Sequence, residues 1–105
     1  MEIKEIQNKS NEIVELIDKK LNVNPDISST FIHLIEEIGE IANHINKPNI
    51  RNEEINKAEL SEEFADVFIL LMRLSSLYDI DIEKEIIAKI EKNKGIMYKL
   101  NHNNL

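Results

Sequence analysis

A short acidic stretch carries the first residues that could do chemistry. Glu36, Glu37 and Glu40 stand within five residues of one another, among aliphatic side chains. On a helix, which turns by about 100° per residue, Glu37 and Glu40 lie side by side at the border of an apolar stripe, and Glu36 lies closer to solvent. Like charges at this spacing repel by roughly a few tenths of a kcal/mol per pair. A cation held between them would turn that repulsion into attraction.

A second acidic pair follows about one helix further along the chain. Glu63 falls inside an apolar helical stripe, and Asp66 comes three residues later at the edge of that stripe. A carboxylate buried alone is costly, so buried acids are normally paired or bound to a metal. The run 67–72 is apolar all round the helix, so solvent is not expected to relieve Glu63. This pair therefore predicts a partner for Glu63 from another helix.

The two acidic segments predict one metal site if their helices pack antiparallel. Hard oxygen ligands without a thiol favour Mg²⁺, with Mn²⁺ as an alternative. Two other interpretations stay open: a solvated charged face, and a transition-metal site that includes His33 and His44, which lie on the same side of the first acidic helix. The predicted ligands of the oxygen site are Glu37, Glu40, Glu63 and Asp66.

Four helices are expected to position these residues. Apolar periodicity predicts helices over 2–21, from about 26 to 45, from between 51 and 58 to about 78, and from 82 to a frayed end near Gly95. Asp26 or Ser28 is expected to cap the second helix, and Asp81 the fourth. Pro48 should break the second helix, which leaves 46–57 as a polar loop able to move over a site. The tail 99–105 is expected to be mobile.

Size and composition restrict the classes of function. A chain of 105 residues forms one domain, and its net charge of −7 disfavours extended contact with nucleic acid. The chain has no cysteine, which excludes disulfides and thiolate metal sites. It shows no apolar run long enough to cross a membrane, no signal-peptide pattern and no glycine-rich phosphate loop. We therefore expect a cytoplasmic protein that has no membrane partner and handles phosphate through metal and lysine.

The paired motifs Glu36-Glu37-x-x-Glu40 and Glu63-x-x-Asp66 resemble those of MazG-like nucleoside triphosphate pyrophosphohydrolases. The resemblance continues through the turn at 77–81 and the segment 89–93, and it covers roughly residues 28 to 98. It implies an all-α, four-helix-bundle-like fold that is oligomeric, with residues 1–98 as a single helical domain. The apolar run 67–72 also predicts an oligomer, because a single chain of this size would leave Phe68 and Ile69 uncovered.

The resemblance also implies a reaction. Family members cleave a nucleoside triphosphate, (d)NTP, between its α and β phosphates, which would make this chain a Mg²⁺-dependent enzyme of nucleotide-pool housecleaning. The four acids would be metal ligands, and Glu36 a catalytic base or a ligand of a second ion. The chain would act as a homodimer, or as a tetramer of paired dimers. Phosphate and nucleotide contacts would come from Lys89, Lys92, Asn93 and Lys94.

One departure from the family pattern and three alternatives accompany this interpretation. Family members often carry an arginine where this chain has Ile96, so phosphate binding would rely on lysine, which lacks a bidentate fork. The same acidic pair also serves phosphoribosyl-ATP pyrophosphatases and dimeric dUTPases. From a different class, the chain could be a non-catalytic helical oligomerisation module.

Overall fold

Four α-helices make up the fold. The computed structural model describes residues 2–103 and contains α1 (Ile3–Leu21), α2 (Ile27–Arg51), α3 (Lys57–Leu77) and α4 (Ile82–Asn103). No strand occurs within these described residues, so the predicted all-α class is confirmed. None of the described helices is both long enough and apolar enough to cross a bilayer.

Short polar side chains fix the helix starts. Asp26 is the N-cap of α2, where its carboxylate accepts from the Ser29 backbone N–H at 2.7 Å, and Ser29 completes a capping box. Asn56 caps α3 through the Glu59 N–H, and Asp81 accepts from the Lys84 N–H at 3.2 Å. The predicted caps at Asp26 and Asp81 are confirmed, and Ser28 is not the cap.

The predicted break of α2 at Pro48 is wrong. The helix passes through Pro48 and ends at Arg51, with Asn52 as a left-handed C-cap (φ 55°). A proline in a helix removes one hydrogen bond and crowds the preceding turn, but one further turn is still formed here before the cap. The polar loop between α2 and α3 is consequently only 52–56, much shorter than the expected 46–57.

The predicted fraying of α4 near Gly95 is also wrong, since the helix continues to Asn103. Gly95 has a helical backbone, and a Cβ at this position would meet no atom within 4 Å. Residues 99–103 therefore belong to α4. Residues 104 and 105 lie outside the described part of the chain, and the mobility of the tail stays a prediction.

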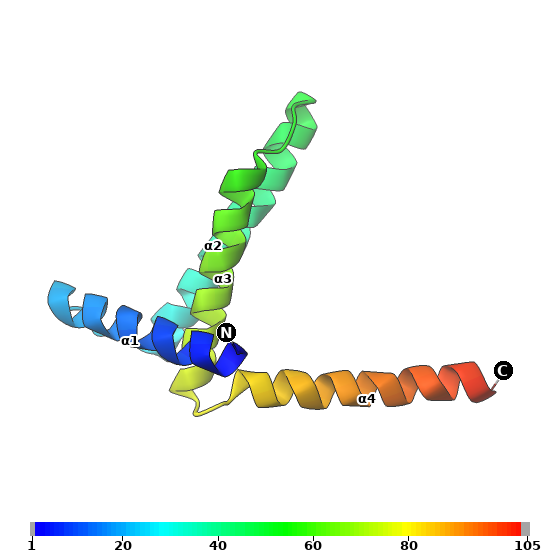
Figure 1. Ribbon diagram of the computed structural model, residues 1–105. Coiled ribbons are helices and arrows are strands. Elements are labelled where there is room, and N and C mark those ends of the chain that lie inside the picture. The colour runs from blue at the N-terminus through cyan, green and yellow to red at the C-terminus, as the bar shows by residue number, and fades with distance from the viewer. Residues whose placement is uncertain (1, 104–105) are drawn as a thin grey trace.

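An antiparallel pair, α2 and α3, makes the most extensive contact between helices and projects as one arm of the molecule (Figure 1). Helix α1 crosses the end of this pair and packs on α3. The buried Gln7 fastens that crossing, because its amide Nε2 donates to Ser76 Oγ at 2.8 Å and to the Ile80 carbonyl at 3.2 Å. Helix α4 packs mainly on α1 and then extends away from the other helices, as Figure 1 shows.

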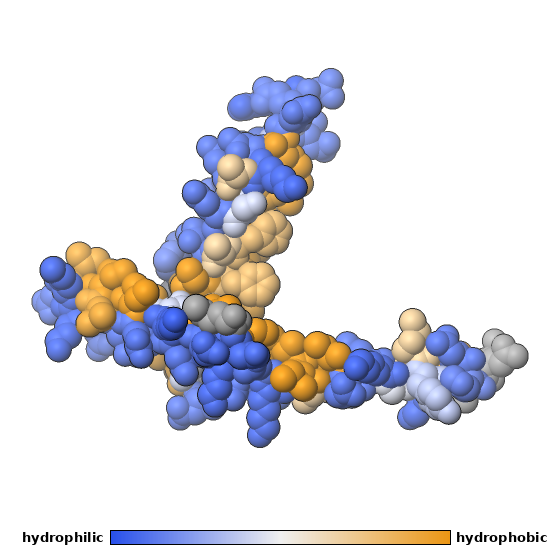
Figure 2. Space-filling view, in the orientation of Figure 1, coloured by the Kyte–Doolittle hydropathy of each residue, from blue (hydrophilic) through white to orange (hydrophobic). Residues whose placement is uncertain are grey.

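The chain leaves much of its apolar surface uncovered. Only Leu34 and Met72 are buried apolar residues among those described, and orange apolar surface is visible on α1 and on the near half of α4 in Figure 2. The radius of gyration is 18.0 Å, whereas a compact chain of similar length would have about 13 Å. The spread arrangement of α1, the α2–α3 pair and α4 in Figure 1 agrees with this large radius.

Candidate metal centre

The antiparallel packing of α2 and α3 places the two acidic motifs opposite each other. Glu37 and Glu40 project from α2, and Glu63 and Asp66 from α3. The spacing of three residues keeps the two acids of each pair on one side of their helix, so both pairs can face the contact between α2 and α3. The condition on which the sequence prediction rested, an antiparallel arrangement of the two helices, is thus met.

Glu63 is the residue that the acidic groups share. Ligand atoms of Glu37, Glu63 and Asp66 lie within 4.8 Å of one another, and the same holds for Glu40, His44 and Glu63. The four predicted acids are therefore brought together as two overlapping groups around Glu63. Their role as metal ligands stays a prediction, because this proximity shows only that their ligand atoms could reach the same ion.

The carboxyl group of Glu63 lacks a donor. Its side chain is 20% exposed, and Oε2 is buried without a hydrogen-bond partner among the described residues. The pKa of Glu63 is raised, mainly because its protonated form hydrogen-bonds to Glu37, and further by burial and by the charges of Glu37 and Asp66. His44 acts in the opposite direction and lowers this pKa. A proton or a cation between the carboxylates would relieve the same repulsion.

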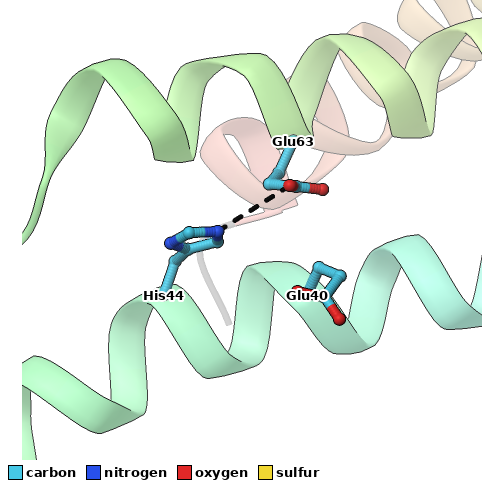
Figure 3. A group of neighbouring side chains, drawn as sticks. All are labelled: Glu40, His44 and Glu63. Atoms are coloured by element: carbon cyan, nitrogen blue, oxygen red, sulfur yellow. Dashed lines mark ion pairs between the residues drawn. The ribbon is translucent and has the colours of Figure 1, made fainter.

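Histidine enters the site through His44. Its Nε2 lies 3.7 Å from Glu63 Oε1, and its Nδ1 lies 3.7 Å from Glu59 Oε2. Figure 3 shows His44 one turn from Glu40 on α2, with its ring directed toward Glu63 on α3. These distances are too long for hydrogen bonds. A protonated His44 would therefore be an ion-pair partner of the two acids, and a neutral His44 would offer a nitrogen atom to a metal ion.

The other residues that the sequence singled out lie outside the two acidic groups. Glu36 is exposed on α2 and belongs to neither of the two groups. His33 Nε2 lies 3.4 Å from Glu37 Oε1, beside the site. The predicted phosphate-binding residues lie on the exposed α4, away from the acids of the same chain (Figure 1). They are Lys89, Lys92, Asn93 and Lys94, of which Lys94 pairs with Glu91 at 3.1 Å.

A cavity of about 360 Å³ adjoins the acids, with walls from α1, α2 and α3. Glu37 and Asp66 belong both to this cavity and to one of the acidic groups. The α1 wall of this cavity, which includes Val14 and Asp18, was not predicted from the sequence. The spacing of Gln7, Asn11, Val14 and Asp18 could have indicated it, because steps of three and four residues put them on one helical stripe.

Comparison with known proteins gives one match. The family model of the MazG nucleotide pyrophosphohydrolase domain matches residues 26–96, from the N-cap of α2 to well inside α4. The matched region includes both acidic motifs and leaves α1 outside. No curated protein and no solved structure matches the chain.

Proposed function

Because the chain belongs to the MazG nucleotide pyrophosphohydrolase family, we propose that it hydrolyses (d)NTP to a nucleoside monophosphate and pyrophosphate with the help of Mg²⁺. The observation that carries the proposal is the position of Glu63, which faces acids of both motifs with a buried oxygen that lacks a donor. The matched family supports hydrolysis of a nucleotide pyrophosphate bond. Cleavage between the α and β phosphates is part of our proposal.

The residues of the site fit a divalent cation. Carboxylates from two helices supply hard oxygen donors. The pKa of Glu63 is raised mainly by the hydrogen bond of its protonated form to Glu37, and further by burial and by the charges of Glu37 and Asp66. Residues that would hold the ion are Glu37, Glu40, Glu63 and Asp66, and His44 offers a nitrogen that Mn²⁺ would accept more readily than Mg²⁺. When bound, the ion would neutralise phosphate charge and lower the pKa of the attacking water.

The protein's own part in the reaction is to orient the substrate and accept a proton. Rigid helices hold the four acids, so little reorganisation is needed when charge develops on the phosphates. We propose Glu36 as the general base that accepts the proton of the attacking water on a carboxylate oxygen. A role for Glu36 at a second ion is the alternative. Its exposed position leaves the carboxylate accessible to either task.

A second copy of the chain is proposed to complete the fold. Helix α1 turns Gln7, Asn11 and Asp18 toward the rest of the chain, whereas its isoleucines, among them Ile13 and Ile17, remain exposed. Phe68 and Ile69 on α3 are exposed as well, as the sequence predicted. Apolar surface spread over several helices of a small chain is best explained by a homodimer, or by dimers paired into a tetramer.

The dimer also offers a role for α4. This helix leads its lysines away from the acids of its own chain (Figure 1). We propose that α4 packs against the second copy, where Lys89, Lys92, Asn93 and Lys94 could reach a substrate bound by the other chain. The cytoplasm, where nucleotide pools reside, is the proposed location, and removal of unwanted nucleotides the proposed role.

The test is pyrophosphate release across a panel of nucleoside triphosphates with Mg²⁺, Mn²⁺ or EDTA. We expect release that requires the metal, with the nucleoside monophosphate as the second product. Phosphoribosyl-ATP and dUTP belong in the panel, because hydrolysis of either one alone would identify a narrower activity. Absence of pyrophosphate with every substrate would overturn the proposal and favour a non-catalytic oligomerisation module.

A further inference from the structure

The cavity beside the acids has two chemically different ends. Glu37 and Asp66 form one end and belong to the proposed metal centre. Asp18, Arg73 and Pro25 line the cavity too, and a second, open pocket shares these three residues without including any residue of the acidic groups. They therefore mark an end that lies away from the metal centre. The volume of about 360 Å³ falls within the range of small-ligand sites.

The walls between these ends are apolar on the sides of α1 and α3, whereas α2 contributes Ser29, Thr30 and His33. Val14 from α1 and Ile69 and Leu70 from α3 face the cavity. A flat, mostly apolar ring with a polar edge suits such walls, because its faces can pack against aliphatic groups while its edge meets a polar residue. If the acids bind the phosphate–metal end of a nucleotide, its base would extend between these walls. This step rests on the proposed function.

Several polar side chains line the cavity, and Asp18 is the one among them, outside the acidic groups, with a buried oxygen that lacks a partner in the described chain. Its Oδ2 is buried and has no hydrogen-bond partner among the described residues. Arg73, which lines the same cavity, directs Nη1 to Glu15 at 2.9 Å. A buried acceptor without a donor is costly, so a ligand that supplies an N–H at this point gains affinity by satisfying it. Arg73 lines the same cavity, and its positive charge disfavours a second metal ion there.

We propose that Asp18 selects the base of the substrate by accepting hydrogen bonds from its N–H groups. A carboxylate is an acceptor only, so it favours bases that carry an exocyclic amino group: guanine, adenine and cytosine. Guanine fits best, because its ring N–H and amino group are adjacent and match both oxygens. Uracil and thymine offer one ring N–H between two carbonyl oxygens, and those oxygens would repel the carboxylate. Asp18 lies on α1, outside the matched family region, so this selectivity belongs to the chain's own α1.

Steady-state kinetics with Asp18→Asn is the first test. For the parent protein we expect kcat/KM to be highest for dGTP and at least about tenfold higher than for dUTP or dTTP, since one charge-assisted hydrogen bond supports that ratio. An amide presents a donor as well as an acceptor, so Asp18→Asn should bring kcat/KM for dGTP to within a few-fold of the values for dUTP and dTTP. The matched control is Glu12→Gln, which removes the same charge from an exposed site on α1 outside the cavity and should leave the ratio unchanged.

Nucleoside binding without metal or phosphate is the second test. An NMR titration of the EDTA-treated protein should show guanosine shifting amide signals around Asp18 and Ser29 at lower concentration than uridine, and Asp18→Asn should remove that difference. Parent kinetics that favour dUTP or dTTP, or an unchanged ratio in Asp18→Asn, would overturn the proposal even if pyrophosphate is released. Conversely, guanosine binding through Asp18 without any pyrophosphate release would refute the proposed reaction and leave the base site standing.

Discussion

Replacing Glu63 by glutamine separates a metal ligand from a structural acid. Glutamine keeps the shape of the side chain and removes its charge, so the change acts on electrostatics. In the metal-free protein, Glu63 suffers repulsion from Glu37 and Asp66, and the only favourable charge nearby in the described chain is His44 at 3.7 Å. That pair is long and partly exposed, so it is expected to contribute little.

The expected result is an apo melting temperature that stays the same or rises by roughly a few degrees. Turnover should fall at least about a hundredfold, the scale of losing one preorganised electrostatic contact in a transition state. Stabilisation by Mg²⁺ should disappear as well. Differential scanning calorimetry in EDTA and in Mg²⁺ measures the first and third effects, and pyrophosphate release measures the second.

The matched control is Glu62→Gln, which removes an exposed charge next to Glu63 that belongs to neither acidic group. It should change none of these three quantities appreciably. The rival view is that Glu63 exists to pair with protonated His44. In that case Glu63→Gln would lower the apo melting temperature, because it would break that pair. That pattern, with turnover near the parent rate, would refute the metal-ligand assignment.

Further outcomes are expected from the same structure. Millimolar Mg²⁺ or Mn²⁺ should raise the melting temperature and EDTA should reverse it; a melting curve indifferent to both, with and without nucleotide, would falsify the metal centre. In EDTA, protonated Glu63 should make its full contribution to stability below its ordinary pKa of 4.5, and this contribution should be lost as the pH rises through its raised pKa. Melting temperatures of the parent and of Glu63→Gln, recorded against pH, should therefore differ in slope above pH 4.5. The lowered pKa values of Asp26 and Asp81 act oppositely, because their contribution is present above 3.8 and is lost in acid. Gly95→Ala should raise the free energy of unfolding by about 0.5–1 kcal/mol in urea titrations, since the new Cβ meets no atom within 4 Å; a loss of stability would show that another chain packs there. Light scattering at micromolar concentration should give at least a dimer, and a monomer would contradict the proposed covering of Phe68 and Ile69.

Local chemistry made several features predictable from the sequence. Apolar periodicity and short polar caps depend on neighbours within about one turn, so the number of helices, the caps at Asp26 and Asp81 and the limits of α3 could be predicted. The pairing of the two acidic motifs could be inferred too, because a buried Glu63 needs partners that its own helix does not supply. Pro48 and Gly95 misled the prediction, since each lowers helix propensity without forbidding the turns that follow.

Contacts between helices decided the rest. The sequence of α1 shows an apolar face of isoleucines, yet the helix contacts α3 through the polar residues Gln7 and Asn11. Gln7 donates to Ser76 Oγ near the end of α3 and to the Ile80 carbonyl just after it. Which stripe of a helix meets a neighbour depends on the crossing of the two helices, and residues distant in sequence set that crossing. For the same reason, only the tertiary structure brings His44 to Glu63 and places Asp18 in a cavity with Glu37 and Asp66, because each of these groupings joins residues of different helices.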